Sequence, residues 1–386
     1  MKRKICIITG SRAEYGLLRL VMHEILRSPQ LELQTIVSGT HLSKEFGHTF
    51  KEIENDGFII DKKIKVLESS DTALAICKSM GNSLISFSRA LSELNPSLIL
   101  VLGDRFEIFS AVSAALVLKI PVAHIHGGET TEGAFDEALR HSITKMSHIH
   151  FVANEEYCKR VIQLGENPSR VFNFGGLGVD NISRLKMMNK KELEIALNLK
   201  FAKRNLLITF HPVTLDKDSS AFQFNELLKV LKKLKNTRLI FTYPNADTDG
   251  RIIIKMIQEF TKNNPYASAF KSLGQLKYLS CINQVDAIVG NSSSGLTEVP
   301  SLKKGTINIG DRQKGRIQAK SIINCDSKEE SISNAIDKLY SKAFKLSLRK
   351  VINPYGNGGA SKKIVNILTN FELNGIVKKS FFDLNE

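Results

Sequence analysis

The sequence predicts an α/β protein with two doubly wound domains, each built on a parallel sheet covered by helices on both faces. Near-continuous apolar runs alternate with amphipathic segments through the first half of the chain, which is typical of parallel strands buried on both faces. The same alternation starts again near residue 204. The 386 residues are too many for one hydrophobic core and suit two domains of ordinary size.

The predicted elements follow these runs in order. In the first half, strands are expected at 4–9, 31–38, 97–103, 120–126 and 148–153, with helices at 71–92 and 105–118. In the second half, strands are expected at 204–210, 237–243, 286–290 and 305–310. The stretch from 176 to 200 begins with glycines and becomes lysine-rich, which suits a connection. We therefore predict domains at 1–178 and 179–359 that face each other across a cleft, and a C-terminal segment, 360–386, whose helix packs on the first domain.

The composition indicates a soluble globular protein, with 42% hydrophobic and 24% charged residues. No stretch approaches the roughly 20 apolar residues of a membrane span, so no membrane association is expected. "MKRK" at the start is followed by the short apolar run "ICII", too short for a secretory signal. The five cysteines are isolated and lack CxxC spacing. Free thiols in a reducing cytoplasm are the expectation.

The net charge of +15 can be interpreted either as a property of a solvated surface or as part of a binding function. Lysines are scattered, with no basic stripe interleaved with aromatic residues, no zinc-finger spacing and no RNP-like motif, so nucleic-acid binding is not expected. The charge is then either a solvated surface or the field of a cleft that attracts a small polyanion.

Polar residues gather where the predicted strands end, which is where ligands bind in doubly wound sheets. The first strand ends in "TGSRAEYG" (9–16), which lacks the full GxGxxG fingerprint of dinucleotide binding. Ser11 and Arg12 stand between strand and helix, where backbone N–H groups favour an anion. Ser11 as a simple N-cap, with Arg12 in solvent, is the competing interpretation.

The strand at 97–103 ends in "GDRFE" (103–107). Asp104 is there either a helix cap or an acid–base group, with a pKa set by Arg105 and by burial. These residues alone leave both alternatives open.

The segment "HIHGGETTEGAFDEALRH" (124–141) concentrates proton-transfer groups at the next strand end. His124 and His126 alternate on a strand and are expected to share a face, with Glu129 just beyond two glycines. On the following helix Asp136 and Arg140 are four apart, as are Glu137 and His141, so each pair is expected to share a face. HxH followed by GGE has no recognised zincin spacing. Acid–base function is favoured here over a metal site.

The second half repeats this placement. "FHPVT" (210–214) puts His211 at a strand end, and "YPNAD" (243–247) does the same for Asn245. "VGNSSSGLTEVPSL" (289–302) is the strongest anion signal, because Asn291, Ser292 and Ser293 open a predicted helix whose N–H groups can bind a diphosphate. Glu298, further on, is a candidate for ribose hydroxyls. "NIGDRQKGR" (308–316) adds Arg312 and Arg316 as phosphate partners or as a basic loop.

Taken together, "GSRAEYG", "GDRFE", "HIHGGE…DEALRH", "FHPVT" and "GNSSSG…E…DRQ.GR" resemble the hydrolysing UDP-N-acetylglucosamine 2-epimerases of bacterial sialic-acid pathways, from about residue 4 to 371. The resemblance implies a GT-B-like fold of two Rossmann-type domains, no redox cofactor or metal, a nucleotide-sugar substrate, and dimers or tetramers. Ala13-Glu14 stands where non-hydrolysing relatives have Pro-Glu, which points to the hydrolysing branch.

The resemblance also assigns roles to residues. Asp104 and Asp136 become acid–base groups. The residues implied to contact the nucleotide or sugar are Arg12, Arg105, His211, Ser292, Ser293, Glu298 and Arg312. Asn245 and Asn291 are further binding candidates from their places at strand ends. Many hydrolysing members read "HIEGGE", whereas here His126 replaces the glutamate, so either His126 or Glu129 transfers the second proton. We prefer His126, because an imidazole titrates near neutrality.

The expected reaction converts UDP-N-acetylglucosamine and water to N-acetylmannosamine and UDP, through elimination to a 2-acetamidoglucal. One alternative is the same reaction on UDP- or GDP-linked N,N'-diacetylbacillosamine, on the route to legionaminic acid. A GT-B glycosyltransferase is a more distant alternative.

Overall fold

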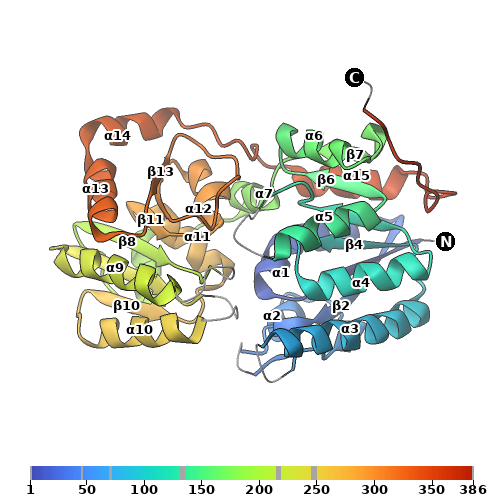
Figure 1. The fold of residues 1–386 in the computed structure, drawn as a ribbon, viewed down its shortest axis with the longest axis horizontal. Coiled ribbons are helices and arrows are strands. Elements are labelled where there is room, and N and C mark those ends of the chain that lie inside the picture. Colours follow the sequence, from blue (N-terminus) through green and yellow to red (C-terminus); the bar gives the residue numbers. More distant parts are fainter. Residues whose placement is uncertain are drawn as a thin grey trace. The chain divides into compact units, whose positions relative to one another are not determined.

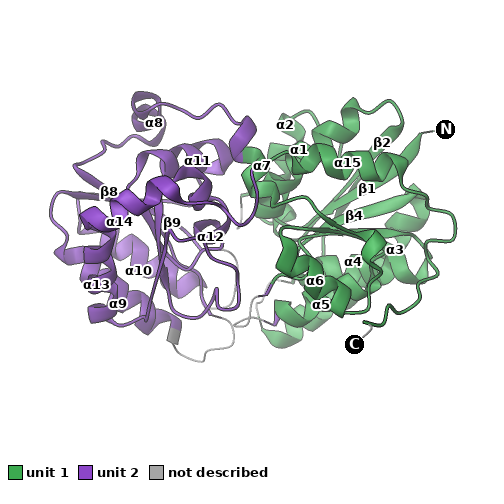
Figure 2. Ribbon diagram, turned by 90° about the horizontal axis from the view of Figure 1, so that it is seen from above, with its two compact units in different colours: residues 1–129, 136–181, 358–386 green, residues 130–135, 182–357 purple. Residues whose placement is uncertain are grey.

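The computed structural model describes residues 2–44, 47–68, 72–130, 135–213, 219–244 and 250–384. The chain divides into two compact units (Figure 2). Unit 1 comprises Met1–Glu129, Asp136–Asn181 and Gly358–Glu386, and unit 2 comprises Thr130–Phe135 and Ile182–Asn357. Each unit has its own sheet and its own apolar core.

Unit 1, as far as it is described, contains a seven-stranded parallel sheet in the order β3-β2-β1-β4-β5-β6-β7 (Figure 1). Its strands are β1 (Arg3–Thr9), β2 (Leu31–Ser38), β3 (Lys62–Ile64), β4 (Leu98–Leu102), β5 (Val122–Ile125), β6 (Ile149–Val152) and β7 (Val171–Asn173). The five strands predicted in this half are confirmed. The sequence did not predict β3 and β7, the short strands at the two edges.

Helices cover both faces of this sheet, as predicted. The helices are α1 (Arg12–Arg27), α2 (Phe50–Asn55), α3 (Ala73–Leu94), α4 (Phe106–Val117), α5 (Asp136–Met146), α6 (Glu155–Gln163), α7 (Leu177–Arg184), whose last residues belong to unit 2, and α15 (Ala360–Asn370), with short 3₁₀ turns η1 (Gly39–Leu42) and η2 (Pro168–Arg170). One apolar cluster joins α1 and α15 to one face. A second cluster joins α3, α4 and α5 to the other.

Unit 2, within its described residues, has a six-stranded parallel sheet in the order β10-β9-β8-β11-β12-β13. Its strands are β8 (Arg204–Thr209), β9 (Thr237–Thr242), β10 (Ala267–Phe270), β11 (Ala287–Gly290), β12 (Gly305–Ile309) and β13 (Ile322–Cys325). Its helices are α8 (Lys190–Leu197), α9 (Ser219–Lys233), α10 (Gly250–Lys262), α11 (Gly274–Gln284), α12 (Ser294–Thr297), α13 (Glu329–Tyr340) and α14 (Lys342–Ser347), with η3 (Val299–Leu302) and η4 (Leu348–Lys350). The four predicted strands are confirmed, whereas β10 and β13 were not predicted.

Both sheets share the doubly wound order in which the chain runs outward from a central strand and then reverses. The reversal lies between β1 and β4 in unit 1 and between β8 and β11 in unit 2. Loops at the carboxyl ends of these strand pairs are the expected ligand sites. From the strand order we therefore expect ligand contacts at Gly10–Arg12 and Gly103–Arg105 in unit 1. In unit 2 we expect them at His211 and Gly290–Ser293.

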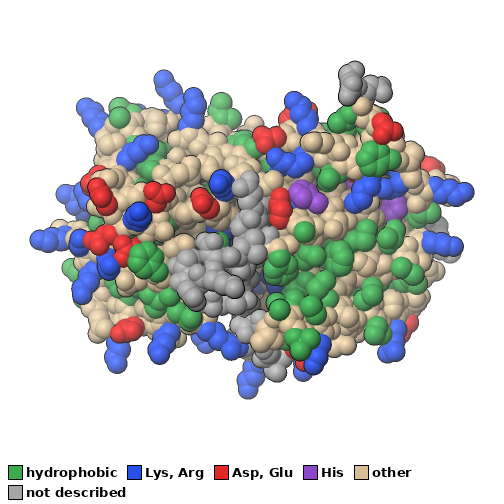
Figure 3. Space-filling view, viewed as in Figure 1, with side chains coloured by type: hydrophobic (Ala, Val, Ile, Leu, Met, Phe, Trp, Pro, Cys, Tyr) green, Lys and Arg blue, Asp and Glu red, His purple; other side chains and the backbone are tan. Residues whose placement is uncertain are grey.

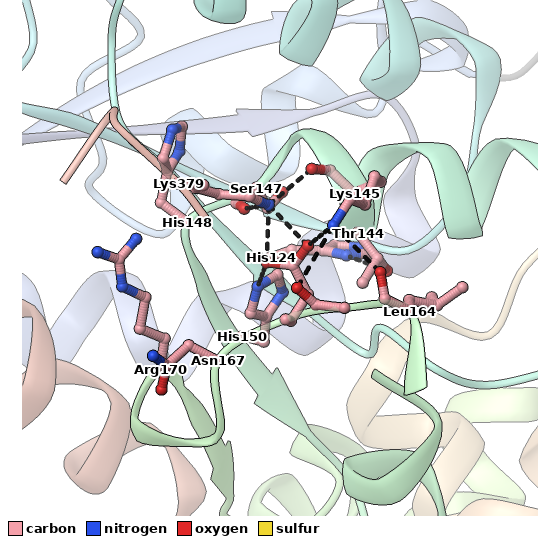
Figure 4. A network of polar contacts seen from close by, with 12 residues as sticks. His124, Thr144, Lys145, Ser147, His148, His150, Leu164, Asn167, Arg170 and Lys379 are labelled. Atoms are coloured by element: carbon pink, nitrogen blue, oxygen red, sulfur yellow. Dashed lines mark hydrogen bonds and ion pairs between the residues drawn. The ribbon is translucent and has the colours of Figure 1, made fainter. Parts of the chain in front are cut away.

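The C-terminal segment belongs to unit 1. Helix α15 packs against α1, and Arg3 Nη1 donates to the carbonyls of Leu368 (2.6 Å) and Phe371 (2.9 Å). Beyond the helix, Lys379 Nζ donates to both carboxylate oxygens of Glu166 at 2.7 Å and to the carbonyls of Lys145 and Ser147 at 2.7 Å (Figure 4). These contacts fasten the tail to the end of α5.

Glu166 is the centre of this tail anchor. Its carboxylate is 1% exposed and also accepts from His150 Nε2 at 3.0 Å and Lys145 Nζ at 2.9 Å. Burial alone would raise the pKa of Glu166, but the donors His150, Lys379 and Lys145 lower it to about 2. The buried carboxylate is thus held ionised by three donors, one of them from the tail.

The surface shows how the net charge is distributed. In Figure 3, Lys and Arg side chains are spread over the visible face rather than gathered in one stripe, which favours a solvated surface. Hydrophobic side chains gather in the same view over α3 and α4. Aliphatic side chains left exposed on these two helices include Leu84 (41%), Ile85 (54%), Leu116 (46%) and Val117 (78%).

Two further expectations are answered by the structure. All five cysteines lie in the described part of the chain and are free thiols, as predicted. Among the described helices, none combines the length and the apolar character needed to span a membrane.

The tail anchor predicts a matched pair of stability effects. Lys379→Met removes the ammonium from buried Glu166 and is expected to cost about 2–4 kcal/mol of unfolding free energy at pH 7, measured by urea denaturation. Lys378→Met, at an exposed neighbouring position, should change it by less than about 0.5 kcal/mol. Equal midpoints for the two variants would contradict the anchor.

The pH dependence of this contribution has a fixed sign. Because the folded-state pKa of Glu166 is lowered from 4.5 to about 2, its stabilisation is fully present above about pH 4.5 and is lost as the pH falls towards 2. Glu166→Gln should therefore flatten the acid limb of the stability curve. An unchanged acid limb in this variant would show that other carboxylates carry it.

Candidate functional site

The loop after β1 combines a helix cap with a half-buried cation. Ser11 is the N-cap of α1, and its Oγ accepts from the Glu14 N–H at 3.4 Å, so the cap interpretation of Ser11 is confirmed. Arg12 is the first residue of the helix. Burial lowers the pKa of its guanidinium, and nearby Glu52 opposes that shift. The loop thus presents a partly desolvated cation at a strand end.

Two buried carboxylates lie beneath this loop. Glu14 Oε2 accepts from the Gly10 N–H at 2.7 Å, and Glu107, 0% exposed, accepts from Arg105 Nε at 3.1 Å. The same Arg105 Nε is 3.9 Å from Glu14. Burial raises the pKa of Glu14 to about 8, with Arg105 opposing the rise and Glu107 adding to it. Sequence reasoning missed this role for Glu14, although Ser11-x-x-Glu14 has the spacing of a capping box.

Asp104 is not a helix cap. The N-cap of α4 is Arg105, with no hydrogen bond from its side chain to the helix, so the cap alternative for Asp104 is wrong. Its carboxylate instead pairs with Arg140 Nη2. Arg140, 3% exposed, also donates from Nη1 to the His126 carbonyl at 3.3 Å. This arginine, which the sequence paired with Asp136, connects two candidate acid–base residues.

His126 and Glu129 form a pair. His126 Nδ1 is 3.2 Å from Glu129 Oε1, and the Leu177 N–H donates to Nε2 at 3.4 Å. These contacts favour the neutral tautomer with the proton on Nδ1 and the lone pair on Nε2. The backbone of His126 has φ 66°, a strained conformation for a non-glycine residue and one that clusters at functional sites. His126 and Glu129, which the sequence analysis treated as alternatives, are therefore in direct contact with each other.

His124 has a different environment. The expectation that His124 and His126 share one face is wrong, because β5 ends at Ile125 and His126 turns away. His124 is fully buried; its Nε2 is 2.8 Å from the Gly103 carbonyl and its Nδ1 3.2 Å from Thr144 Oγ1. Burial lowers its pKa to about 3. It is a neutral structural residue that joins the ends of β4 and β5.

The glycine pair lets this loop pass close to α6. A Cβ on Gly128, where φ is 76°, would lie 2.6 Å from the Tyr157 carbonyl oxygen, which is too close for any side chain. Arg160 Nη1 in addition donates to the Gly128 carbonyl at 2.6 Å. The position next to Glu129 is therefore fixed by packing as well as by hydrogen bonding.

Asp136 is the first residue of α5 and is half-buried. On the same helix, the predicted pair of Glu137 and His141 is confirmed, with 3.1 Å between His141 Nε2 and Glu137 Oε1. Residues 131–134 of the loop "ETTEGAFDEA" (129–138), in which we expect sugar contacts, lie outside the described residues.

In unit 2 the amide of Asn291 joins two loops. Its Oδ1 accepts from the His211 N–H at 2.7 Å, and its Nδ2 donates to the His211 carbonyl at 2.8 Å. The Asn291 carbonyl accepts from Arg312 Nη1 at 3.1 Å and Gln313 Nε2 at 2.8 Å. Burial, and then Arg312, lower the pKa of His211 well below its ordinary value. Three predicted residues thus meet, and His211 is a neutral imidazole beside a guanidinium.

The serine-rich loop differs from the expectation in one respect. Asn291 and Ser292 do not open a helix: α12 begins at Ser294, has four residues, and its N-cap is Ser293, whose side chain makes no cap hydrogen bond. Gly290, at φ 138°, brings the loop so close to β8 that a Cβ would lie 2.0 Å from the Thr209 carbonyl oxygen. The loop therefore presents an irregular backbone rather than a long helix N-terminus.

Glu298 and Tyr278 lie beside this loop. Burial raises the pKa of Glu298, and Ser294 opposes the shift. Burial, and then the carboxyl group of Glu298, raise the pKa of the Tyr278 phenol. Hydrogen bonds with Ser294 and Ser292 oppose this rise. Tyr278, in α11, was not predicted, because a lone tyrosine on an amphipathic helix gives no signal.

The remaining predicted residues are placed as follows. Asn245 lies outside the described residues. Arg316 Nε donates to the Thr130 carbonyl at 2.8 Å within unit 2. Among the described residues, no group of three or more His, Cys, Asp or Glu side chains is arranged to hold a metal ion. Unit 1 thus offers carboxylates and an imidazole for proton transfer, and unit 2 offers hydroxyls, backbone groups and a guanidinium for an anion.

Comparison with known proteins identifies the relatives of this chain. The family model for UDP-N-acetylglucosamine 2-epimerase matches residues 23–369. The chain is 47% identical to the GDP/UDP-N,N'-diacetylbacillosamine 2-epimerase (hydrolyzing) of Campylobacter jejuni over 99% of this chain and 100% of that protein. It is 40% identical to polysialic acid biosynthesis protein P7 of Escherichia coli, over 100% and 98%. It is 34% identical to the UDP-N,N'-diacetylbacillosamine 2-epimerase (hydrolyzing) of Legionella pneumophila, over 97% of each.

Solved structures agree on the fold. The UDP-GlcNAc 2-epimerase of Neisseria meningitidis, bound to UDP-GlcNAc, superposes with a TM-score of 0.81 at 20% identity, covering 95% of this chain and 99% of that chain. The enzyme from Methanocaldococcus jannaschii, in complex with UDP-GlcNAc and UDP, gives 0.77 at 19%, with coverage of 95% and 99%. At these identities the likeness establishes the fold alone. The predicted GT-B-like architecture of two Rossmann-type sheets is confirmed.

Proposed function

This chain belongs to the UDP-N-acetylglucosamine 2-epimerase family, and from that membership we propose that it is a hydrolysing 2-epimerase of a nucleotide sugar. It inverts C2 of a 2-acetamido sugar and releases the free sugar and the nucleoside diphosphate. The hydrolysing assignment is supported by the names of the relatives from C. jejuni and L. pneumophila.

The substrate we propose is N,N'-diacetylbacillosamine linked to UDP or GDP. The observation that carries this choice is 47% identity across the full length of the C. jejuni enzyme that acts on this sugar. It displaces the first expectation, UDP-N-acetylglucosamine, whose 2-epimerase in N. meningitidis is 30% identical. The product is then 2,4-diacetamido-2,4,6-trideoxymannose, a precursor of legionaminic acid.

The chemistry follows from the weak acidity of the C2–H bond. No carbonyl is conjugated with a carbanion at C2, so direct deprotonation is very slow. When the nucleoside diphosphate leaves C1, positive charge builds on the ring and the C2 proton becomes removable. Elimination gives a 2-acetamidoglucal; water then adds at C1 and a proton is delivered to C2 from the opposite face. The site must supply a base and an acid on two sides of one ring.

Unit 1 supplies groups suited to these proton transfers. Asp104, as the anionic partner of Arg140, is a proton acceptor. We assign the second proton transfer to His126 Nε2, which requires the contact from the Leu177 N–H to open. Glu129, 3.2 Å from Nδ1, orients the ring and stabilises the imidazolium, as carboxylates do in catalytic triads. Asp136, four residues before Arg140 on α5, is the further acid–base candidate.

Unit 2 supplies groups suited to the departing diphosphate. Ser292 and Ser293 offer hydroxyl and backbone donors, and Arg312 offers a guanidinium, which binds phosphate oxygens bidentately. Glu298 can accept from ribose hydroxyls. His211, held neutral and fixed by Asn291, is a directional contact rather than a charge. Arg12 and Arg105 of unit 1 complete the cations we assign to the phosphates and sugar.

We also propose that the enzyme is a cytoplasmic homo-oligomer. The five free thiols suit a reducing compartment. The exposed aliphatic side chains of α3 and α4 (Figure 3) suit burial against a second copy, because contiguous apolar surface is typical of protein–protein contacts. This face therefore supports association through unit 1.

The reaction is tested with two sugar nucleotides incubated separately in D₂O. We expect UDP- or GDP-linked N,N'-diacetylbacillosamine to release nucleoside diphosphate without any acceptor, with kcat/KM at least about 10-fold above that for UDP-N-acetylglucosamine. The mannose-type product should carry one deuterium at C2, detected by mass spectrometry and NMR. Product without deuterium at C2 would exclude elimination. Dependence on an added acceptor would instead indicate a glycosyltransferase.

The roles of His126 and Glu129 are separated by two conservative variants. We expect His126→Gln to lower kcat about 10³-fold, because it removes the proton-transfer group. Glu129→Gln, which keeps an oxygen near Nδ1, should lower it about 10- to 100-fold with little change in KM. Glu137→Gln, on the same segment but paired with His141, is the control and should stay within about 2-fold. Full turnover in His126→Gln with none in Glu129→Gln would reverse the assignment.

The oligomer is tested by sedimentation velocity at micromolar concentration. We expect the mass of two or four chains, and Ile85→Lys/Val117→Lys should dissociate it, because two cations would be buried in an apolar contact. Ile195→Lys, at a side chain 81% exposed on α8, should leave the mass unchanged. A monomeric wild-type protein would contradict the proposed contact.

A further inference from the structure

Unit 2 has a concave site at the amino ends of β11 and β12, the end of the sheet opposite the loops assigned to the nucleotide. The pocket has a volume of about 610 Å³, within the range of small-molecule sites. Asp286 precedes β11, and Lys303 and Lys304 precede β12. The other lining residues come from the end of α13, from α14 and from η4. Ser292 follows the other end of β11, about 13 Å away along four residues of strand. The pocket is thus separate from the loops assigned to the diphosphate.

Positive charge dominates this pocket. Lys303, Lys304, Lys345 and Arg349 line it, and Asp286 is the acidic residue among its lining side chains. The guanidinium of Arg204 lies 4.3 Å from the ring centroid of Tyr340, another lining residue. Four cations and one carboxylate therefore line the pocket, unlike the scattered lysines elsewhere on the surface.

One oxygen of the Asp286 carboxylate is hydrogen-bonded within the protein. This oxygen, Oδ2, accepts from the Asn205 N–H at 2.7 Å and from the Tyr340 hydroxyl at 3.3 Å. Lys304 is partly withdrawn from water, and burial lowers its pKa while Asp286 opposes the shift. Lys304 has lost part of its hydration to burial, and its nearby carboxylate already accepts other hydrogen bonds. An external anion would therefore stabilise this cation, because it would replace the lost hydration.

The pocket also has an apolar part. Leu339 is buried and Leu348 is half-buried. Tyr340, the residue after Leu339, also lines the pocket. The Lys345 ammonium is 5.2 Å from the centroid of that ring. Aliphatic and aromatic surface beside clustered cations suits a compact ligand that carries both a carbon skeleton and negative charge.

We propose that this pocket binds a phosphorylated small molecule carrying at least two negative charges, at a site separate from the one assigned to the substrate. The cations gather inside a concavity of small-molecule size, which favours such a ligand over an extended polyanion, whose contacts would follow a stripe. Lys304, Lys345 and Arg349 bind the phosphate oxygens, and the ring of Tyr340 packs against the carbon skeleton.

The test uses the full chain at 150 mM NaCl, with pyrophosphate as the probe in isothermal titration calorimetry and UDP present at saturation. One saturable site per chain is expected. Lys304→Met/Lys345→Met should weaken its affinity at least about tenfold, because charge-assisted contacts are lost. Lys262→Met/Lys271→Met removes the same charge from exposed positions of unit 2 outside the pocket and should change affinity less than about twofold.

Two controls separate the alternatives. If pyrophosphate binding responds to Arg312→Met and not to the pocket pair, the probe occupies the nucleotide loop and the proposal is overturned, whatever the enzyme's substrate. If both double substitutions weaken pyrophosphate binding equally, the anion is held by a diffuse positive field rather than by a site. Saturable binding of a single-stranded oligonucleotide that is lost in both double variants would lead to the same conclusion. Absence of saturable binding at this salt concentration also overturns it. None of these outcomes depends on turnover of a sugar nucleotide.

Discussion

The contact on which the candidate catalytic side depends is the one between Arg140 and Asp104. Arg140 is almost fully buried, and a buried guanidinium is stable only if its charge is paired and its N–H groups are hydrogen-bonded. Asp104 provides the charge and the His126 carbonyl provides a further acceptor. One arginine thereby fixes the ends of β4 and β5 relative to the start of α5. The left-handed backbone of His126 is tolerated because these neighbours hold it.

In unit 2 an uncharged group performs the corresponding task. Asn291 is fully buried, and its side-chain amide both accepts from and donates to the backbone of His211. Its backbone carbonyl accepts hydrogen bonds from Arg312 and Gln313. The neutral amide can satisfy a donor and an acceptor at once, without the desolvation cost of an ion. Ser292 and Ser293 lie half-buried in the same loop, and the Ser292 hydroxyl also interacts with the phenol of Tyr278.

The sequence predicted the central strands well, because parallel strands buried on both faces are short apolar runs between helices. It missed β3, β7, β10 and β13, all three or four residues long, because edge strands are defined by pairing with a distant neighbour. It also placed the polar loops correctly and named most of their residues. The interaction partners of those residues were harder to predict from the sequence. Helical spacing placed Arg140 on one face with Asp136, but no local pattern indicates its ion pair with Asp104, 36 residues away.

The way the tail closes on unit 1 has a consequence for biosynthesis. The chain completes all of unit 2 before it makes α15 and Lys379. Domains generally fold as units while the chain emerges from the ribosome. Unit 1, however, lacks one of the three donors to Glu166, and the helix that packs against α1, until α15 and Lys379 have been synthesised. The N-terminal sheet, although synthesised first, is therefore the later of the two to reach its final packing. The part of the α1 surface that α15 covers stays exposed for the time needed to translate more than half of the chain.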